Sequence, residues 1–193
     1  MDGNLWRTTV TIPEYTHALG EATGHGWGFL AAYGGTWLVC ATLWYRASPR
    51  TAAYATLFQG MVALPIALGL TAITATVDRP ELDGMDMLSV LLSVGQLLVL
   101  PLVIFLVATR RYTLVPLAMA IVLVVHFAPY SWLYATPLYL IMGAAVAIGV
   151  TAAMGLKVRI DLPEEQLSTI QAGRASLTTG LVLVASAILA WFL

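Results

Sequence analysis

Long apolar stretches without a charged side chain constrain the fold of this chain more than any other feature. Residues 53–76 contain no Asp, Glu, Lys or Arg, and similar stretches recur along the chain. An α-helix needs about 20 apolar residues to cross a hydrocarbon core ~30 Å thick. Residues 1–193 therefore fit one all-α domain, a polytopic membrane protein built as a bundle of six transmembrane helices. The predicted spans are Trp27–Trp44, Ala53–Thr76, Met87–Thr109, Thr113–Phe127, Tyr134–Leu156 and Ala175–Leu193.

The composition supports a membrane protein and argues against a nucleic-acid-binding or disulfide-stabilised protein. The mean hydropathy is +0.85 and only 10% of the residues are charged, as is typical of an integral membrane protein. A formal net charge of -1 gives no basis for a nucleic-acid partner, so the lipid bilayer is the first predicted partner. The single cysteine, Cys40, excludes an internal disulfide and a cysteine-based metal cluster.

The distribution of Lys and Arg predicts the orientation of the chain. Seven of the nine lie on one side of the predicted spans, and only Arg7 and Arg79 lie on the other. Because Lys and Arg stay on the cytoplasmic side during insertion, we expect a protein of the bacterial cytoplasmic (inner) membrane with both termini outside. Residues 1–26 would form an outer segment and helix extension, and residues 157–174 a cytoplasmic loop and the start of helix six.

A repeated Asp-x-Pro-Glu pattern raises the question of an internal repeat. It occurs at residues 78–81 and 161–164, at an offset that also carries spans one to three nearly onto spans four to six. Two three-helix units of opposite orientation form the 3+3 inverted repeat of many secondary transporters. The alternative is that two segments simply share the same helix-capping residues.

Polar and helix-breaking residues occur inside the apolar stretches. Gln59 and Gln96 are the strongest polar groups there, and they fit either an interhelical hydrogen bond or the lining of a polar cavity. Proline removes a backbone donor, so it predicts kinks and packed or hydrated surroundings. The prolines in or near the spans are Pro65, Pro101, Pro116 and Pro137.

Histidine and glutamate alternate before the first span. Thr11 and Glu14 fit a capping box. On one continuous helix from there to Trp44, the side chains of Glu14, His17, Glu21 and His25 would form one stripe. Imidazole and carboxylate suit a transition metal, and the candidate ligands are His17, His25 and Glu21. The simpler interpretation is a solvated helix face, with glycines in this segment breaking the helix. No other cofactor is predicted.

The segment "HFAPYSWLY" joins spans four and five without a charge. Trp132 and Tyr134 fit an aromatic belt at the membrane interface, but His126 is not explained in this way. The segment resembles one in a family of small bacterial multi-pass membrane proteins of unknown function, which shares His-x-x-Pro-Tyr-Ser-Trp-Leu-Tyr at the same place. The resemblance supports six spans and directs attention to His126, Tyr130 and Gln59, and it implies no activity.

Three functions are compatible with these features. The first is a transporter or small-solute-binding membrane protein with an outward-opening polar pocket. The second is an accessory or scaffold subunit, in which small-residue faces of helices one and five hold a homodimer or larger complex. The third is a metal-dependent membrane enzyme using the outer His and Glu residues, although no nucleophile–base pair or hydrolase motif is evident. The predicted pocket residues are His126, Tyr130, Gln59 and Gln96.

Overall fold

The computed structural model of the chain describes residues 10–75, 78–155 and 163–193. Every regular element within these ranges is helical. Short 3₁₀ segments interrupt or extend several of the α-helices. The elements are α1 (Ile12–Thr23), η1 (Gly24–Gly26), α2 (Trp27–Arg46), α3 (Pro49–Thr74), α4 (Met85–Gly95), η2 (Gln96–Val99), α5 (Leu100–Ala108), η3 (Tyr112–Leu114), α6 (Val115–Phe127), α7 (Tyr130–Leu133), α8 (Leu138–Gly155) and α9 (Glu164–Trp191).

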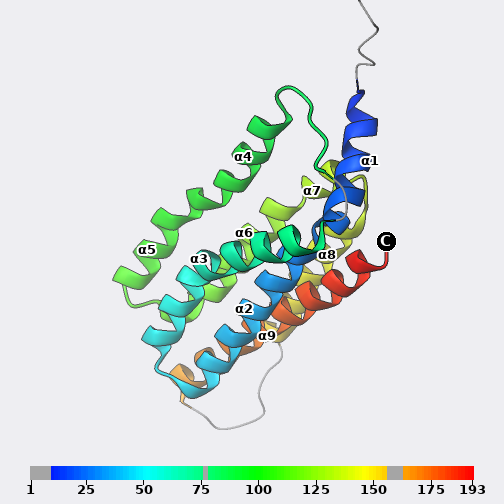
Figure 1. The fold of residues 1–193 in the computed structure, drawn as a ribbon. Helices are drawn as coiled ribbons and strands as arrows, with labels where there is room; N and C mark the ends of the chain where they lie inside the picture. The colour runs from blue at the N-terminus through cyan, green and yellow to red at the C-terminus, as the bar shows by residue number, and fades with distance from the viewer. Residues whose placement is uncertain (1–9, 76–77, 156–162) are drawn as a thin grey trace, which may run out of the picture.

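Helix α2 is the centre of the bundle and lies along both α3 and α9 (Figure 1). Small residues let the α2 and α9 backbones approach closely. A Cβ atom added to Gly34 would lie 2.8 Å from Val184 Cγ2 and 2.9 Å from the Val184 backbone nitrogen. One added to Gly180 would lie 2.8 Å from Leu38 Cδ2. Glycine at these positions therefore brings the two helices into contact at both places.

Helices α6 and α8 complete the packed part of the bundle, with α8 lying against α6 and α9. A Cβ atom on Gly149 would lie 2.6 Å from Thr178 Cγ2 of α9. In the first predicted span, a Cβ atom on Gly28 would lie 3.1 Å from Thr71 Oγ1 of α3. These small residues of spans one and five thus pack within the chain, and the predicted homodimer draws no support from them.

The segment α4–η2–α5 packs at the edge of the bundle, where it contacts α3 and α6 (Figure 1). It begins after Gly84, whose φ of 86° is a left-handed conformation that glycine adopts without strain. The 3₁₀ stretch η2 interrupts it directly before Pro101, which stands in the first turn of α5. The interruption lies where the sequence predicted a kink.

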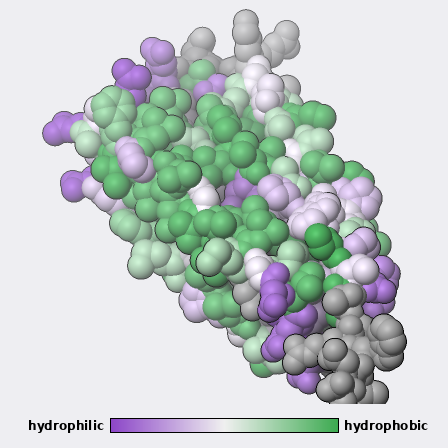
Figure 2. Space-filling view, turned by 90° about the horizontal axis from the view of Figure 1, so that it is seen from above, coloured by the Kyte–Doolittle hydropathy of each residue, from purple (hydrophilic) through white to green (hydrophobic). Residues whose placement is uncertain are grey.

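The helices are suited to a membrane. Figure 2 shows hydrophobic residues over most of one face of the molecule and hydrophilic residues gathered toward two ends. Five helical stretches in the described part of the chain are long and apolar enough to cross a bilayer. Helix α2, which coincides with the first predicted span, is not among these five. The five are Pro49–Thr74, Val90–Ala108, Tyr112–Leu133, Leu138–Gly155 and Glu164–Trp191.

The N-terminal helix differs from the predicted one. The capping box is confirmed: the Thr11 backbone N–H donates to Glu14 Oε2 at 2.8 Å, and the Glu14 N–H donates to Thr11 Oγ1 at 3.4 Å. The continuous helix to Trp44 is wrong, because α1 ends at Thr23 and η1 separates it from α2. The three residues of η1 have φ angles of 53°, 50° and 74°, so the backbone turns left-handed there.

The two copies of the Asp-x-Pro-Glu pattern stand in different positions relative to the helix that follows each of them. Pro80 and Glu81 precede a helix that begins only at Met85, whereas Pro163 caps α9 directly. Asp161 and Leu162 lie outside the described residues. Helix α9 also lies along α2 and α8, while its counterpart α4–η2–α5 lies apart from the centre. The inverted repeat stays a prediction that these contacts do not support.

We expect the protection of the α1 backbone amides against hydrogen exchange to depend on pH, because of the Glu14 carboxyl. Hydrogen bonds from the Thr11 N–H and hydroxyl lower the pKa of the exposed Glu14 carboxyl in the folded protein. The resulting stabilisation of α1 is present above the unfolded pKa of about 4.3 and is lost as the pH falls through the folded pKa. Hydrogen exchange of the α1 amides, corrected for the intrinsic rate, should show this loss in the wild type. Glu14→Ala should abolish the pH dependence, and Glu165→Ala in α9 should leave it unchanged.

Candidate functional site

Two neighbouring cavities lie between the packed helices and the α4–η2–α5 segment. The first, here called the glutamine cavity, has a volume of about 300 Å³ and is lined from α2, α3, η2, α5 and α6, including Gln59 and Gln96. The second, the tyrosine cavity, has a volume of about 710 Å³ and is also lined from α1, α4, α7 and α8. The two cavities are neighbours, as six shared lining residues show. These are Tyr33, Leu64, Gln96, Leu97, His126 and Phe127.

The four residues predicted to form a polar pocket lie around these two cavities. Gln96 and His126 line both of them. Gln59 lines the glutamine cavity, and Tyr130 lines the tyrosine cavity. Side chains that are far apart in the sequence thus meet around two neighbouring cavities.

Two residues that line the glutamine cavity each have a buried polar atom without a protein partner among the described residues. The Gln59 side chain is 5% exposed and its Oε1 atom accepts no hydrogen bond there. Trp37 is 1% exposed and its indole Nε1–H donates none. Leaving such a group without a partner costs about 1–3 kcal/mol. Both atoms are themselves fully buried, so they lie behind the wall of the cavity and do not face its open space.

Trp44, two turns after Trp37 on the same helix, shows the usual arrangement. Its Nε1–H donates to Thr56 Oγ1 at 3.1 Å, and the Thr56 hydroxyl donates to the Ala52 carbonyl at 2.8 Å. Buried indole groups normally find such a partner. Trp37 departs from this arrangement although both tryptophans are buried to a similar degree, and the Tyr15 and Ser176 hydroxyls also lack a partner.

Polar residues stand where the edge segment meets the bundle beside the cavities. Tyr33 of α2 lies beside Gln96 of η2, and both line the two cavities. His126 of α6 lies beside the backbone of Leu92 in α4. The predicted pocket residues Gln96 and His126 therefore stand at the boundary between α4–η2–α5 and the packed helices.

Aromatic rings form one wall of the tyrosine cavity. The ring centroids of Phe127 and Tyr139 are 5.8 Å apart, and Tyr130 lies 5.5 Å from Phe127. Tyr134 joins this cluster at 5.6 Å from Tyr139 and is 7% exposed. The interpretation of Tyr134 as an interfacial belt residue is therefore wrong, because its ring is buried in the protein. Trp132, at 52% exposed, remains free for that role.

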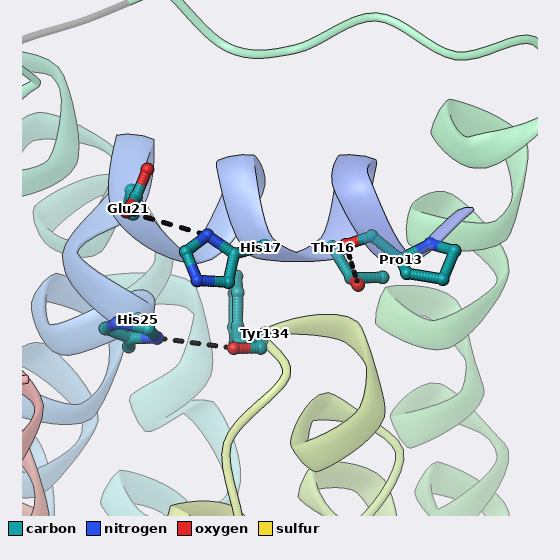
Figure 3. A network of polar contacts seen from close by, with 6 residues as sticks. All are labelled: Pro13, Thr16, His17, Glu21, His25 and Tyr134. Carbon is teal, nitrogen blue, oxygen red and sulfur yellow. Dashed lines mark hydrogen bonds and ion pairs between the residues drawn. The ribbon is translucent and has the colours of Figure 1, made fainter. Parts of the chain in front are cut away.

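His25 contacts the segment after α7 instead of extending a stripe of ligands. Its Nδ1 atom lies 3.3 Å from the Tyr134 carbonyl oxygen, as Figure 3 shows, and its own carbonyl accepts a hydrogen bond of 2.7 Å from the Tyr139 hydroxyl. His17 Nδ1 lies 3.5 Å from Glu21 Oε1, with both side chains mostly exposed.

The predicted metal ligands are thus divided between two environments. His17 and Glu21 pair with each other on the surface of α1, while His25 faces the Tyr134 carbonyl beyond the helix break. The described residues contain no group of three or more His, Cys, Asp or Glu side chains placed to hold a metal ion. The metal site stays a prediction without geometric support.

The sequence interpretation missed Tyr33 and Trp37. Both line the glutamine cavity, and they stand four residues apart on α2. Residues at that spacing share a helix face. The spacing, together with the polar atom that each side chain must satisfy, could have indicated a polar face directed toward Gln59.

The described residues form an all-helical fold with five helices long and apolar enough to cross a bilayer, the arrangement expected of a helical membrane protein. The comparison with family models specifies it further. A model matches residues 12–192, so the chain belongs to DUF7010, a family of unknown function. Membership in a family of unknown function agrees with the resemblance noted in the sequence, whose nine-residue motif and bacterial source stay predictions. Neither a curated protein nor a solved structure matches the chain.

Proposed function

We propose that this protein binds a small solute at the glutamine cavity and transports it across the bacterial cytoplasmic membrane. The observation that carries the proposal is the convergence of Gln59, Gln96 and His126, from three separate elements, on one cavity of about 300 Å³. Ligand pockets have volumes of about 300–1,000 Å³, with mostly apolar walls and a few polar groups. Uncharged polar groups in an apolar bundle fit a solute-binding role.

The proposal includes a six-span topology with α2 as the sixth membrane helix. Successive connections lie at alternating ends of the bundle in Figure 1. The described basic residues Arg46, Arg50, Arg110 and Arg111 all lie in or beside the connections at one end. That end would face the cytoplasm. α1 and the tyrosine cavity would then lie toward the outside, and the cavities would open outward.

Helix packing supports a moving part for transport. The α4–η2–α5 segment packs less extensively than α2, α8 or α9, and η2 interrupts its helical hydrogen bonding. Broken helices beside a substrate site are common in transporters. A shift of this segment would alter the Tyr33–Gln96 contact and with it the access to both cavities.

Cysteine labelling tests whether the cavities open outward. The only cysteine, Cys40, is buried and would first be replaced in Cys40→Ala. In spheroplasts, a charged, membrane-impermeant methanethiosulfonate reagent should label Gln96→Cys in this background. Leu98→Cys is the matched control, because Leu98 lies in the same 3₁₀ stretch, is 83% exposed and lines neither cavity. It should stay unlabelled in lipid.

The other outcomes contradict the proposal in different ways. Labelling of Gln96→Cys only in inverted vesicles would mean that the cavities open to the cytoplasm. Absence of labelling from both sides would mean a dry interior and would favour the scaffold function. Equal labelling of Leu98→Cys would mean that water reaches both faces of η2, which contradicts a cavity bounded by a lipid-facing helix.

A further inference from the structure

We infer that the tyrosine cavity binds an amphipathic anion with a single apolar chain, its acidic head group at Arg79 and its chain between α3 and α4. The inference goes beyond the solute-binding function proposed for the glutamine cavity and does not depend on it. It follows from the one charged side chain in the lining, from the length of the cavity and from the exposure of its aliphatic wall.

Arg79 supplies the charge of the tyrosine cavity. It is the only Asp, Glu, Lys or Arg among the described residues of the lining. Asp78, Glu81 and Asp83 belong to the same connection before α4, but none of them lines the cavity. Arg79 also lies near Tyr134, in the aromatic wall. A guanidinium group has five N–H donors, so it can bind an anion and still keep a contact within the protein.

The place of Arg79 in the fold is unusual for a membrane protein. It follows the end of α3, whereas Arg46 and Arg50 flank the beginning of this helix. Arg110 and Arg111 lie at the same end as these two (Figure 1). Basic residues gather on the cytoplasmic side of membrane proteins, which accounts for that group of four. It does not account for an arginine that lines a cavity at the other end, and an anionic ligand does.

The threonine hydroxyls of the lining are already engaged as donors. Thr23 donates to the Leu19 carbonyl oxygen at 2.7 Å, and Thr71 donates to the Ala67 carbonyl oxygen at 2.9 Å. Each hydroxyl carries one proton, so neither can donate to a ligand at the same time. Arg79 is therefore the strongest donor that the lining offers to an acidic head group.

The cavity is elongated along α3. Its lining residues on this helix follow one another at three or four positions from Leu64 to Ala75, so they form one face. At about 1.5 Å per residue, this face is ~16 Å long. The volume of about 710 Å³ holds roughly 24 groups of the size of a water molecule at ~30 Å³ each. One extended chain with its head group fits this space, whereas a second chain would lie outside it.

The aliphatic wall of the cavity is open to the surroundings of the protein. Five aliphatic side chains of α3, α4 and η2 line the cavity and are nevertheless between 43% and 60% exposed. Within a bilayer such a wall faces lipid, so an amphiphile can enter from the side with its head group at the membrane surface. The five are Leu64, Leu68, Val90, Val94 and Leu97.

Photo-crosslinking tests the inference on the full-length protein in nanodiscs of phosphatidylcholine, a lipid without net charge. Two probes are dodecanoic acids with a diazirine either near the carboxyl group or at the end of the chain, used at mildly alkaline pH to keep the carboxyl ionised. Specific labelling is the part that excess unlabelled dodecanoate removes, and mass spectrometry locates it. The first probe should label Thr71 and Ala75, and the second Leu64 and Leu97.

Substitutions of Arg79 separate its charge from its packing. Arg79→Gln should reduce the specific labelling by about tenfold or more, because a charge-assisted hydrogen bond is lost. Arg79→Lys keeps the charge and should keep most of the labelling. Arg50→Gln, at the opposite end of α3, is the control and should label as the wild type does.

A second pair of variants tests the chain site without changing a charge. Val94→Phe adds a ring to the aliphatic wall and should largely abolish specific labelling by both probes. Val125→Phe is the matched control, because Val125 is 68% exposed on α6 and lines neither cavity. It should leave the labelling unchanged.

Competition identifies the chemistry of the head group. Dodecanesulfonate should compete as well as dodecanoate, dodecanol about tenfold more weakly, and dodecyltrimethylammonium not at all. Equal competition by dodecanol and dodecanoate, or full labelling of Arg79→Gln, would overturn the anionic head group. Specific labelling at exchanged positions, or none on α3 and α4, would overturn the binding mode.

Phosphatidylglycerol added to the nanodiscs distinguishes two sources of the anion. Displacement of the probes would identify an anionic membrane lipid, and persistence of the labelling would identify a free single-chain acid. Both results support an amphipathic anion at Arg79. Labelling of Gln96→Cys from outside is a separate measurement, so failure of the crosslinking leaves the proposed function standing.

Discussion

Replacing Gly26 by alanine should destabilise the folded protein by roughly 2–5 kcal/mol, the largest loss we expect from a single methyl group in this chain. Gly26 has φ of 74°, which costs an L-residue about 1–2 kcal/mol. The new Cβ would also overlap the Tyr139 hydroxyl and lie 2.9 Å from Tyr134 Cε2. Tyr139 is 1% exposed, and its hydroxyl donates a hydrogen bond to the His25 carbonyl oxygen. The side chain therefore has little room to move. Overpacking adds about 1–3 kcal/mol.

Gly84→Ala separates these two causes. Gly84 has φ of 86°, but an added Cβ meets nothing within 4 Å. Gly84→Ala should therefore lose only the stability that the left-handed backbone costs an L-residue, about 1–2 kcal/mol. The measurement is unfolding in mixed micelles of increasing sodium dodecyl sulfate, followed by circular dichroism. Equal losses in the two variants would show that the contact between η1 and the tyrosine cluster does not matter for stability.

Gly34→Ala should cause the second largest loss of stability among these changes. We expect it to lower the free energy of unfolding by about 1–3 kcal/mol relative to the control variant Gly35→Ala. The added Cβ would lie 2.8 Å from Val184 Cγ2 and 2.9 Å from the Val184 backbone nitrogen. A side chain can rotate away, but a helix backbone cannot. The α2 and α9 helices would have to separate along their length, and the shift would reach Trp37 on the cavity side of α2.

The control for this prediction is the next residue. Gly35→Ala makes the same chemical change in the same turn of α2, and its Cβ would meet nothing within 4 Å. Alanine favours a helix over glycine by up to about 1 kcal/mol, so this variant should be neutral or more stable than the wild type. The same micelle titration gives both values. A loss for Gly35→Ala as large as that for Gly34→Ala would contradict close packing of α2 on α9.

Local sequence rules predicted most of the helical elements. The capping box of Thr11 and Glu14 begins α1 where expected, and the 3₁₀ interruption η2 stands directly before Pro101. Such features depend on residues within a few positions of each other, so they are visible in the sequence. The fifth predicted span is misplaced at its start, because Tyr134 belongs to the turn after α7 and α8 begins at Leu138.

The break in the first helix depends on distant partners. Glycines at 24 and 26 permit a left-handed turn but do not require one. His25 also adopts φ of 50°, and its backbone is held there by Tyr139 from α8. A residue more than a hundred positions away thus decides the local conformation, and periodicity cannot show this.

The candidate site was accessible to prediction only in part. Gln59 and Gln96 stand out because polar groups are rare in apolar stretches, and both line the glutamine cavity. Trp37 did not stand out, because tryptophan is common in membrane helices. Its significance is the missing partner of Nε1, which only the three-dimensional arrangement reveals.

The left-handed turn at 24–26 has one more consequence, for tolerance to insertions. In a continuous helix, adding one residue rotates everything before it by ~100° relative to everything after it. Here α1 joins α2 through a non-helical turn anchored by Tyr134 and Tyr139, so the register of the two helices is not shared. A residue inserted in α1 would turn the His17–Glu21 face around its own axis and leave Tyr33 and Trp37 at the cavity.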